Sequence, residues 1–291
     1  MTNSALGMIG LGAMGAPMAH HLLAKHGTLT ITGRRPQPEL VNSGATWVNT
    51  ARELAANVDA VLLMLPDLPQ LEEVLSGEQG LLAGVRDTGL LLMIGSTSSA
   101  TGVRELAERL ATESNGLVRV VDCPVSGGED GANAGTLSVM VGGEKDDADL
   151  AATLLAPCGN PVHLGPLGAG QVAKACNQMV VSATILALGE ATVLADRSGI
   201  DLEKMWDLLS GGYAGSRLLD SRKDKLVSGD DSPSGMAKYM VKDLASAAEI
   251  AEATGTNTAL LPTLRAAFDE IVASGLGDQD IAVSRRFVAE R

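Results

Sequence analysis

Over the first 164 residues, short apolar runs alternate with helix-like stretches, and this alternation constrains the fold more than any other feature of the sequence. Several runs are continuously apolar, as strands covered on both faces are expected to be. Strands that alternate with helices favour a parallel sheet with crossover helices, so an α/β domain is predicted. The predicted strands are residues 6–9, 28–32, 60–65, 90–94, 118–122, 137–141 and 162–164, and the predicted helices are residues 16–25, 51–56, 69–75, 101–113 and 145–155.

From residue 170 onward the pattern is helical only. Residues 171–198 contain no proline, and residues 179–188 are apolar nearly all round, so a helix here must be buried within a domain or between subunits. A segment rich in glycine and proline, residues 165–170, separates the two patterns. We therefore predict two domains, residues 1–164 and residues 165–291, the second all-helical. Its further helices are predicted at residues 202–209, 216–225, 240–254 and 261–274.

Charge and composition restrict the partners of the chain. The 22 Lys and Arg residues are outnumbered by 35 Asp and Glu residues, and the net charge of −13 argues against a nucleic-acid partner. No uninterrupted apolar run approaches the ~20 residues of a membrane-spanning helix, so no membrane partner is expected. The three cysteines show no CxxC spacing, the four histidines show no metal-ligand pattern, and no basic-then-apolar leader precedes the first strand. We expect a cytoplasmic protein with free thiols and no metal site.

A glycine-rich turn follows the first predicted strand. Its residues are Gly10, Leu11, Gly12, Ala13, Met14 and Gly15. A GxGxxG motif between a strand and a helix is typical of dinucleotide binding. The first glycine permits the tight turn, the second lets the backbone approach a pyrophosphate, and the third allows close packing of helix on strand. The N-terminus of the following helix offers free N–H groups to the phosphates.

The end of the second predicted strand indicates which dinucleotide is bound. NAD sites usually carry an Asp or Glu here that binds the ribose 2′-hydroxyl. This chain instead has Arg34 and Arg35, whose guanidinium groups suit a 2′-phosphate through bidentate hydrogen bonds. The alternative is a pair of solvated loop arginines. We predict NADP as the cofactor, with NAD as the second choice.

Two further strand ends are candidates for cofactor contacts. Met64, Leu65 and Pro66 close one predicted strand, and Ser96 and Thr97 follow the next. Open α/β sheets bind their ligands at the carboxyl ends of parallel strands. Ser96 and Thr97 are equally suited to capping the helix that follows them.

Two other segments carry side chains suited to chemistry. Ser126, Gly127 and Gly128 form a small, flexible turn after a predicted strand. The N–H groups of such a turn, with the serine hydroxyl, can bind a carboxylate, although Ser-Gly-Gly is also a common loop sequence. Lys242 and Asp243 open a later helix and alone resemble an ordinary surface pair.

Lys174, Asn177 and Gln178 lie at i, i+3 and i+4 of the long predicted helix and share one face. A partly desolvated lysine shifts its pKa readily and can donate or accept a proton. The alternative is a lysine whose stem covers apolar surface while its amine reaches water.

Four segments, GLGAMGAPMA, DCPVSGG, GAGQVAKACNQ and SPSGMAKYMVKDL, occur in the order seen in the β-hydroxyacid dehydrogenases. The chain resembles this family over essentially its whole length. The family includes 3-hydroxyisobutyrate dehydrogenases and tartronate semialdehyde (2-hydroxy-3-oxopropionate) reductases. The resemblance implies an N-terminal Rossmann domain, a long interdomain helix and an all-helical C-terminal domain that often helps to form dimers or tetramers.

The resemblance also implies roles for individual residues. Lys174 matches the catalytic lysine, and the 126–128 turn matches the loop that holds the substrate carboxylate. Arg34 matches an arginine of NADP-preferring relatives. Lys242 and Asp243 match a motif near the nicotinamide, the first as a cofactor contact and the second as a substrate contact.

Asn177 and Gln178 match residues that orient the substrate, and Gln178 replaces the asparagine usual in the family. The implied activity is an NADP-preferring oxidoreductase that interconverts a small 3-hydroxy acid and its semialdehyde. Two alternatives stay open. One is an imine reductase of the same architecture, and the other is a catalytically silent NADP(H)-binding regulator.

Overall fold

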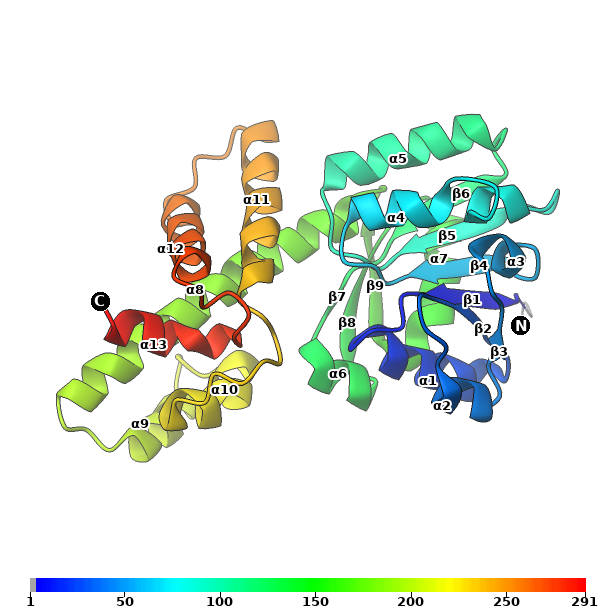
Figure 1. Cartoon of the computed structure of the whole chain (residues 1–291). Coiled ribbons are helices and arrows are strands. Elements are labelled where there is room, and N and C mark those ends of the chain that lie inside the picture. The colour runs from blue at the N-terminus through cyan, green and yellow to red at the C-terminus, as the bar shows by residue number, and fades with distance from the viewer. Residues whose placement is uncertain (1–3) are drawn as a thin grey trace. The chain divides into compact units, whose positions relative to one another are not determined.

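The computed structural model describes residues 4–291, and its contacts divide the chain into two compact units (Figure 1). Unit 1 extends to Lys174, and unit 2 comprises Ala175–Arg291. The sheet ends at Gly165, whereas the contacts divide the chain inside the helix that follows. The predicted boundary after residue 164 therefore stays a prediction.

Unit 1 is built on one mixed sheet. Its strands are β1 (Leu6–Ile9), β2 (Thr30–Thr32), β3 (Thr46–Trp47), β4 (Ala60–Leu63), β5 (Leu90–Ile94), β6 (Val118–Asp122), β7 (Val125–Ser126), β8 (Leu137–Gly142) and β9 (Gly159–Gly165). The first six strands are parallel in the order β3-β2-β1-β4-β5-β6, which is the order of a doubly wound dinucleotide-binding sheet. The prediction of an α/β domain is confirmed. The sheet differs from the predicted parallel one because β8 runs antiparallel to both β6 and β7.

Helices cover both faces of this sheet (Figure 1). They are α1 (Gly15–His26), α2 (Pro38–Asn42), α3 (Ala51–Ala55), α4 (Leu68–Leu75), α5 (Ala100–Glu113), α6 (Gly128–Ala134) and α7 (Lys145–Leu155), with the 3₁₀ turns η1 (Leu81–Gly84) and η2 (Ala156–Cys158). Successive side chains of β5 point to opposite faces of the sheet. Leu91 and Met93 pack in the core under α1, α2, α6 and α7, whereas Leu92 and Ile94 pack under α3, α4 and α5.

Unit 2 is helical, as predicted. The long helix α8 (Ala169–Arg197) begins in unit 1 and continues into unit 2. The others are α9 (Leu202–Ser210), α10 (Arg217–Ser228), α11 (Lys238–Ala253), α12 (Leu261–Ala273) and α13 (Ser284–Ala289), with the 3₁₀ turn η3 (Ile281–Val283). Their core surrounds Trp206 and Phe268, which are both fully buried.

Burial along α8 is one-sided. Ile185 and Leu188 pack in the core of unit 2, whereas Val180 and Leu194 are exposed. Burial of the apolar stretch within a domain is therefore confirmed on one face of the helix, and burial of the other face between subunits stays a prediction. By length and composition α8 is also long and apolar enough to cross a membrane, although part of it is buried within the protein. Partly buried core helices of soluble proteins have the same character, so the absence of a membrane partner stays a prediction.

Candidate functional site

The glycine-rich turn at the end of β1 has the geometry that its sequence predicts. Gly10 has φ of 99°, and a Cβ there would lie 2.2 Å from the Met64 carbonyl oxygen. A Cβ on Gly15 would lie 1.8 Å from the Gly10 carbonyl oxygen, so this position requires close contact between helix and turn. Gly12 is different, because a Cβ there would meet no atom within 4 Å and the residue is exposed to solvent. The turn therefore offers an exposed backbone ahead of α1 that fits a dinucleotide pyrophosphate.

The ends of β4 and β5 are tied together next to this turn. Met64 donates its N–H to the Ile9 carbonyl at 2.8 Å, and Leu65 donates its N–H to the Ser96 hydroxyl at 2.9 Å. Ser96 is buried, so its hydroxyl positions the neighbouring strand end. The cap of α5 is Ser99, whose hydroxyl accepts from Gly102. The alternative of a helix cap at Ser96 or Thr97 is therefore wrong, and their contact with a cofactor stays a prediction.

Arg34 and Arg35 are exposed just after β2. The last residue of β2, Thr32, is paired with Ile9, the last residue of β1. Both arginines therefore follow the strand beside the glycine-rich turn, at the same edge of the sheet. Their placement fits contact with the adenosine end of a dinucleotide.

The Ser-Gly-Gly segment is a junction between a strand and a helix rather than a flexible loop. Ser126 ends β7 and pairs with Ser138 of β8, and Gly128 begins α6. Gly127 and Gly128 have φ of 139° and 63°, a backbone conformation that other residues rarely adopt. Both sides of this turn are held in regular structure, and its contact with a substrate carboxylate stays a prediction.

Lys174 lies in the second turn of α8, within unit 1, and its side chain is buried. One turn before it, Gln171 bonds to the loop that follows β5. The Gln171 amide oxygen accepts from the Ser98 N–H at 2.9 Å, and its amide nitrogen donates to the Ser96 carbonyl at 2.8 Å. Gln171 and Lys174 share a helix face because they are three residues apart. This places Lys174 on the face of α8 that meets the carboxyl edge of the sheet.

Asp122, at the end of β6, holds the start of α8 and was not identified as a site residue from the sequence. Its carboxylate accepts the N–H groups of Gly168 and Gln171, each at 2.7 Å. Burial raises the pKa of Asp122 to about 6, against the opposing effect of these two hydrogen bonds and of Arg104. A carboxylate directly after the apolar pair Val120 and Val121, at the end of a predicted strand, was the signal available in the sequence.

In unit 2, four of the predicted residues form one hydrogen-bonded chain. Asn177 donates its amide to the Gln178 side-chain oxygen at 3.0 Å, and Gln178 donates to Asp243 Oδ2 at 2.7 Å. Lys242 donates to Asp243 Oδ1 at 2.8 Å. Asp243 and Gln178 are buried, and a buried carboxylate that accepts two donors is held in a fixed orientation. The Lys242–Asp243 pair is thus part of a buried network rather than an ordinary surface pair.

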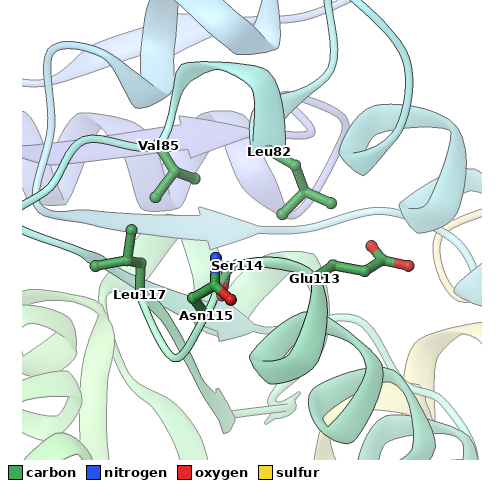
Figure 2. A pocket seen from close by; sticks show the side chains of 6 residues that line it. All are labelled: Leu82, Val85, Glu113, Ser114, Asn115 and Leu117. Carbon is green, nitrogen blue, oxygen red and sulfur yellow. The ribbon is translucent and has the colours of Figure 1, made fainter.

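The described residues contain a hollow at the opposite edge of unit 1. Figure 2 shows its lining, which consists of Leu82, Val85, Glu113, Ser114, Asn115 and Leu117. Val85 and Leu117 precede β5 and β6, so the hollow lies at the amino ends of the strands. It contains none of the predicted site residues, and ligands of open α/β sheets bind at the other edge. Within residues 4–291, no group of three or more His, Cys, Asp or Glu is arranged to hold a metal ion.

Comparison with known protein families assigns both halves of the chain. Residues 5–168 match the family described as the NAD binding domain of 6-phosphogluconate dehydrogenase. Residues 168–287 match the family described as NAD-binding of NADP-dependent 3-hydroxyisobutyrate dehydrogenase. Together the two matches cover nearly the whole chain.

Individual relatives are similar over almost their full length. The chain is 35% identical to 2-hydroxy-3-oxopropionate reductase of Escherichia coli over 273 residues, covering 93% of this chain and 92% of the relative. It is 32% identical to the NAD-dependent L-serine dehydrogenase of Pseudomonas aeruginosa, covering 97% and 96%. A solved structure of Mycobacterium tuberculosis 3-hydroxyisobutyrate dehydrogenase with L-serine is 28% identical, with a TM-score of 0.83 and coverage of 98% and 99%.

Proposed function

Since this chain belongs to the β-hydroxyacid dehydrogenases, a family of nicotinamide-dependent oxidoreductases, we propose that it interconverts a small 3-hydroxy acid and its semialdehyde. The preferred cofactor in this proposal is NADP. The proposed substrates are small carboxylates such as 3-hydroxyisobutyrate, tartronate semialdehyde and serine. Relatives named for the last two support this range.

The observation that carries the proposal is the position of Lys174. Its buried side chain lies on a helix whose preceding turn is bonded to the loop after β5. That loop lies at the carboxyl edge, where the glycine-rich turn after β1 also lies. A buried amine at the ligand-binding edge of an open α/β sheet is suited to proton transfer.

The residues of the chain have the following proposed roles. The exposed backbone of the turn around Gly12 holds the cofactor pyrophosphate, and the bound nicotinamide supplies or accepts the hydride. The 126–128 turn binds the substrate carboxylate and so fixes the reacting carbon. Lys174 Nζ takes the hydroxyl proton during oxidation and returns it to the carbonyl oxygen during reduction. Gln178 and Asp243, held by their mutual hydrogen bond, orient the substrate.

The preference for NADP rests on Arg34 and Arg35. Both are exposed after β2, where a carboxylate would select NAD. Guanidinium groups bind phosphate through two parallel hydrogen bonds, which a ribose hydroxyl cannot match. A relative named as NAD-dependent shows that the cofactor varies among similar proteins, so this choice needs its own measurement.

An activity screen tests the proposed function. Purified protein is assayed with NADPH and NADH against tartronate semialdehyde and methylmalonate semialdehyde, and with NADP and NAD against 3-hydroxyisobutyrate, glycerate and serine. We expect turnover of at least one of these carboxylates and a higher kcat/KM with the phosphorylated cofactor. Turnover of cyclic imines without turnover of any carboxylate would favour the imine reductase alternative. Tight binding of NADPH without turnover would favour a silent regulator.

A further inference from the structure

Three side chains fix the first turn of α8 to unit 1, and we call them the α8 anchor: Arg104, Asp122 and Gln171. The Asp122 carboxylate is fully buried and accepts the N–H groups of Gly168 and Gln171 at 2.7 Å each. These N–H groups are among those that a helix N-terminus leaves without an intrahelical partner. Asp122 therefore caps α8 from a neighbouring strand, which ties the helix to the end of β6.

The side chain of Gln171 makes a second, independent link. It is 1% exposed and bonds through both of its amide atoms to the loop after β5. Rotation of α8 about its own axis would break both bonds and leave a buried amide unpaired, which is unfavourable. Asp122 thus fixes the helix along its axis, and Gln171 fixes its rotation.

The backbone around the anchor is packed so closely that the glycines next to it could not carry a side chain. A Cβ on Gly142 would lie 2.4 Å from Asp122 Oδ1, and a Cβ on Gly170 would lie 2.1 Å from the Met140 carbonyl oxygen. Arg104 donates from Nε to the Leu167 carbonyl at 2.9 Å and so holds the segment that leads into α8. The anchor therefore has little room in which to shift.

We propose that Asp122 and Gln171 are positioning residues for proton transfer at Lys174. Lys174 follows Gln171 by three residues, which is about 4.5 Å along the helix axis on the same face. Whatever fixes the height and rotation of the first turn of α8 also fixes the base of the Lys174 side chain. The inference rests on the proposed function, because it takes Lys174 as the group that moves the proton.

Two substitutions of Gln171 test the proposal without adding bulk. Gln171→Met keeps the length of the side chain but removes both hydrogen bonds. Gln171→Glu keeps an acceptor for the Ser98 N–H and loses the donor to the Ser96 carbonyl. Asp59→Asn is the matched control, because Asp59 accepts the Ala5 N–H at 2.9 Å at the amino edge of the sheet, away from α8.

The measurements are kcat, the Kd of the dinucleotide, and the primary isotope effect with a hydride donor deuterated at the transferred position. Displacement of a reacting group by about 1 Å costs about 10²-fold in rate, so we expect kcat to fall about 10- to 100-fold in Gln171→Met and less in Gln171→Glu. The isotope effect should rise because chemistry becomes slower than product release. The dinucleotide Kd should be unchanged, as should all three quantities in Asp59→Asn.

Hydrogen exchange separates failure of this inference from failure of the proposed function. Peptides that cover residues 168–174 should exchange faster in Gln171→Met and in Asp122→Asn than in the wild type, with the sheet protected as before. A wild type that turns over no carboxylate overturns the proposed function and the role of Lys174 together. An active wild type whose folded Gln171→Met variant keeps its kcat and isotope effect overturns the positioning role alone.

Discussion

At the scale of single residues, the three glycines of the turn after β1 have separable roles. A Cβ on Gly15 would collide with the Gly10 carbonyl oxygen, whereas a Cβ on Gly12 would meet no atom within 4 Å. Gly12→Ala should therefore change the free energy of unfolding by less than about 0.5 kcal/mol, and Gly15→Ala should lower it by about 1–3 kcal/mol.

Although Gly12→Ala should leave stability almost unchanged, it should impair binding of the dinucleotide by the folded protein. Gly12→Ala should weaken dinucleotide binding about tenfold or more, since its methyl group stands where the pyrophosphate must approach. Urea unfolding and a fluorescence titration with NADPH measure the two quantities. A Gly12→Ala protein that folds normally and binds NADPH as tightly as the wild type would contradict this assignment of the turn.

Arg34 and Arg35 carry the predicted cofactor preference. Hydrogen bonds to charged groups contribute about 1.5–3 kcal/mol, so changing both residues to alanine should raise the KM for NADPH about 10- to 100-fold. The KM for NADH should change much less, because NADH lacks the 2′-phosphate. Arg52→Ala, an exposed arginine on α3, serves as the control. A wild type that prefers NADH would show that these arginines do not select the cofactor.

At the scale of elements, the sequence predicts those with a strong local pattern. Buried strands such as β5 and long helices such as α5 are found within a few residues of their predicted bounds. The two-residue strands β3 and β7 are too short to show a period, and α6 contains glycines that disfavour helix. These elements form because neighbouring strands and helices hold them, which local sequence does not reveal.

Within the candidate site, too, the sequence predicts only the parts whose residues are close together in the chain. The glycine-rich turn could be predicted because its residues are adjacent in the sequence and each glycine has a local role. The α8 anchor could not, because Asp122 bonds to residues 46 and 49 positions away, and Gln171 bonds to residues 73 and 75 positions away. Such pairs require knowledge of which strand ends meet the start of α8.

The burial of the Asp122 carboxyl predicts a dependence of stability on pH. The folded-state pKa of about 6 lies above the ordinary value of 3.8, so between these two values the folded protein holds a proton that the unfolded chain has released. Protonation of Asp122 therefore stabilises the folded protein fully below pH 3.8, and this stabilisation is lost as the pH rises through 6. The loss lowers the free energy of unfolding by up to about 3 kcal/mol. The charge of Arg104 acts on this carboxyl and opposes the rise in its pKa, and the Asp122 charge in turn helps to raise the pKa of the buried Cys123 thiol.

Urea unfolding of the wild type and of Asp122→Asn measures this effect. Other carboxyl groups titrate equally in both proteins and cancel in the difference. The advantage in unfolding free energy of the wild type over the variant should shrink between about pH 4 and about pH 6.5 and stay constant above that range. A difference that does not change with pH would show that Asp122 titrates normally.

At the scale of the whole molecule, the exposed apolar side chains of unit 2 predict self-association. Val180 and Leu194 on α8 are 60% and 68% exposed, and Leu208 on α9 is 76% exposed. Val180 and Leu194 are fourteen residues apart, which places them within about 40° of each other around the helix. Large apolar side chains this exposed on one side of a helix are suited to a contact with a second copy of the chain, so we expect a homodimer or homotetramer.

Light scattering at micromolar concentration tests this prediction. The wild type should have the mass of a dimer or a tetramer, and Val180→Glu combined with Leu194→Glu should reduce the mass. Leu260→Glu, on an exposed apolar residue before α12, is the control and should leave the mass unchanged. A monomeric wild type would refute the prediction.

The proposed reaction depends on Lys174 as the residue that moves the proton. The most direct measurement is the single-turnover rate of Lys174→Ala with saturating cofactor and the best substrate from the screen. Positioned acid–base groups contribute about 10²–10⁴-fold, so the rate should fall by that factor, and Lys174→Arg should restore little because a guanidinium stays protonated. NADPH binding should be retained. A folded Lys174→Ala protein whose rate stays within a few-fold of the wild type would show that Lys174 does not move the proton.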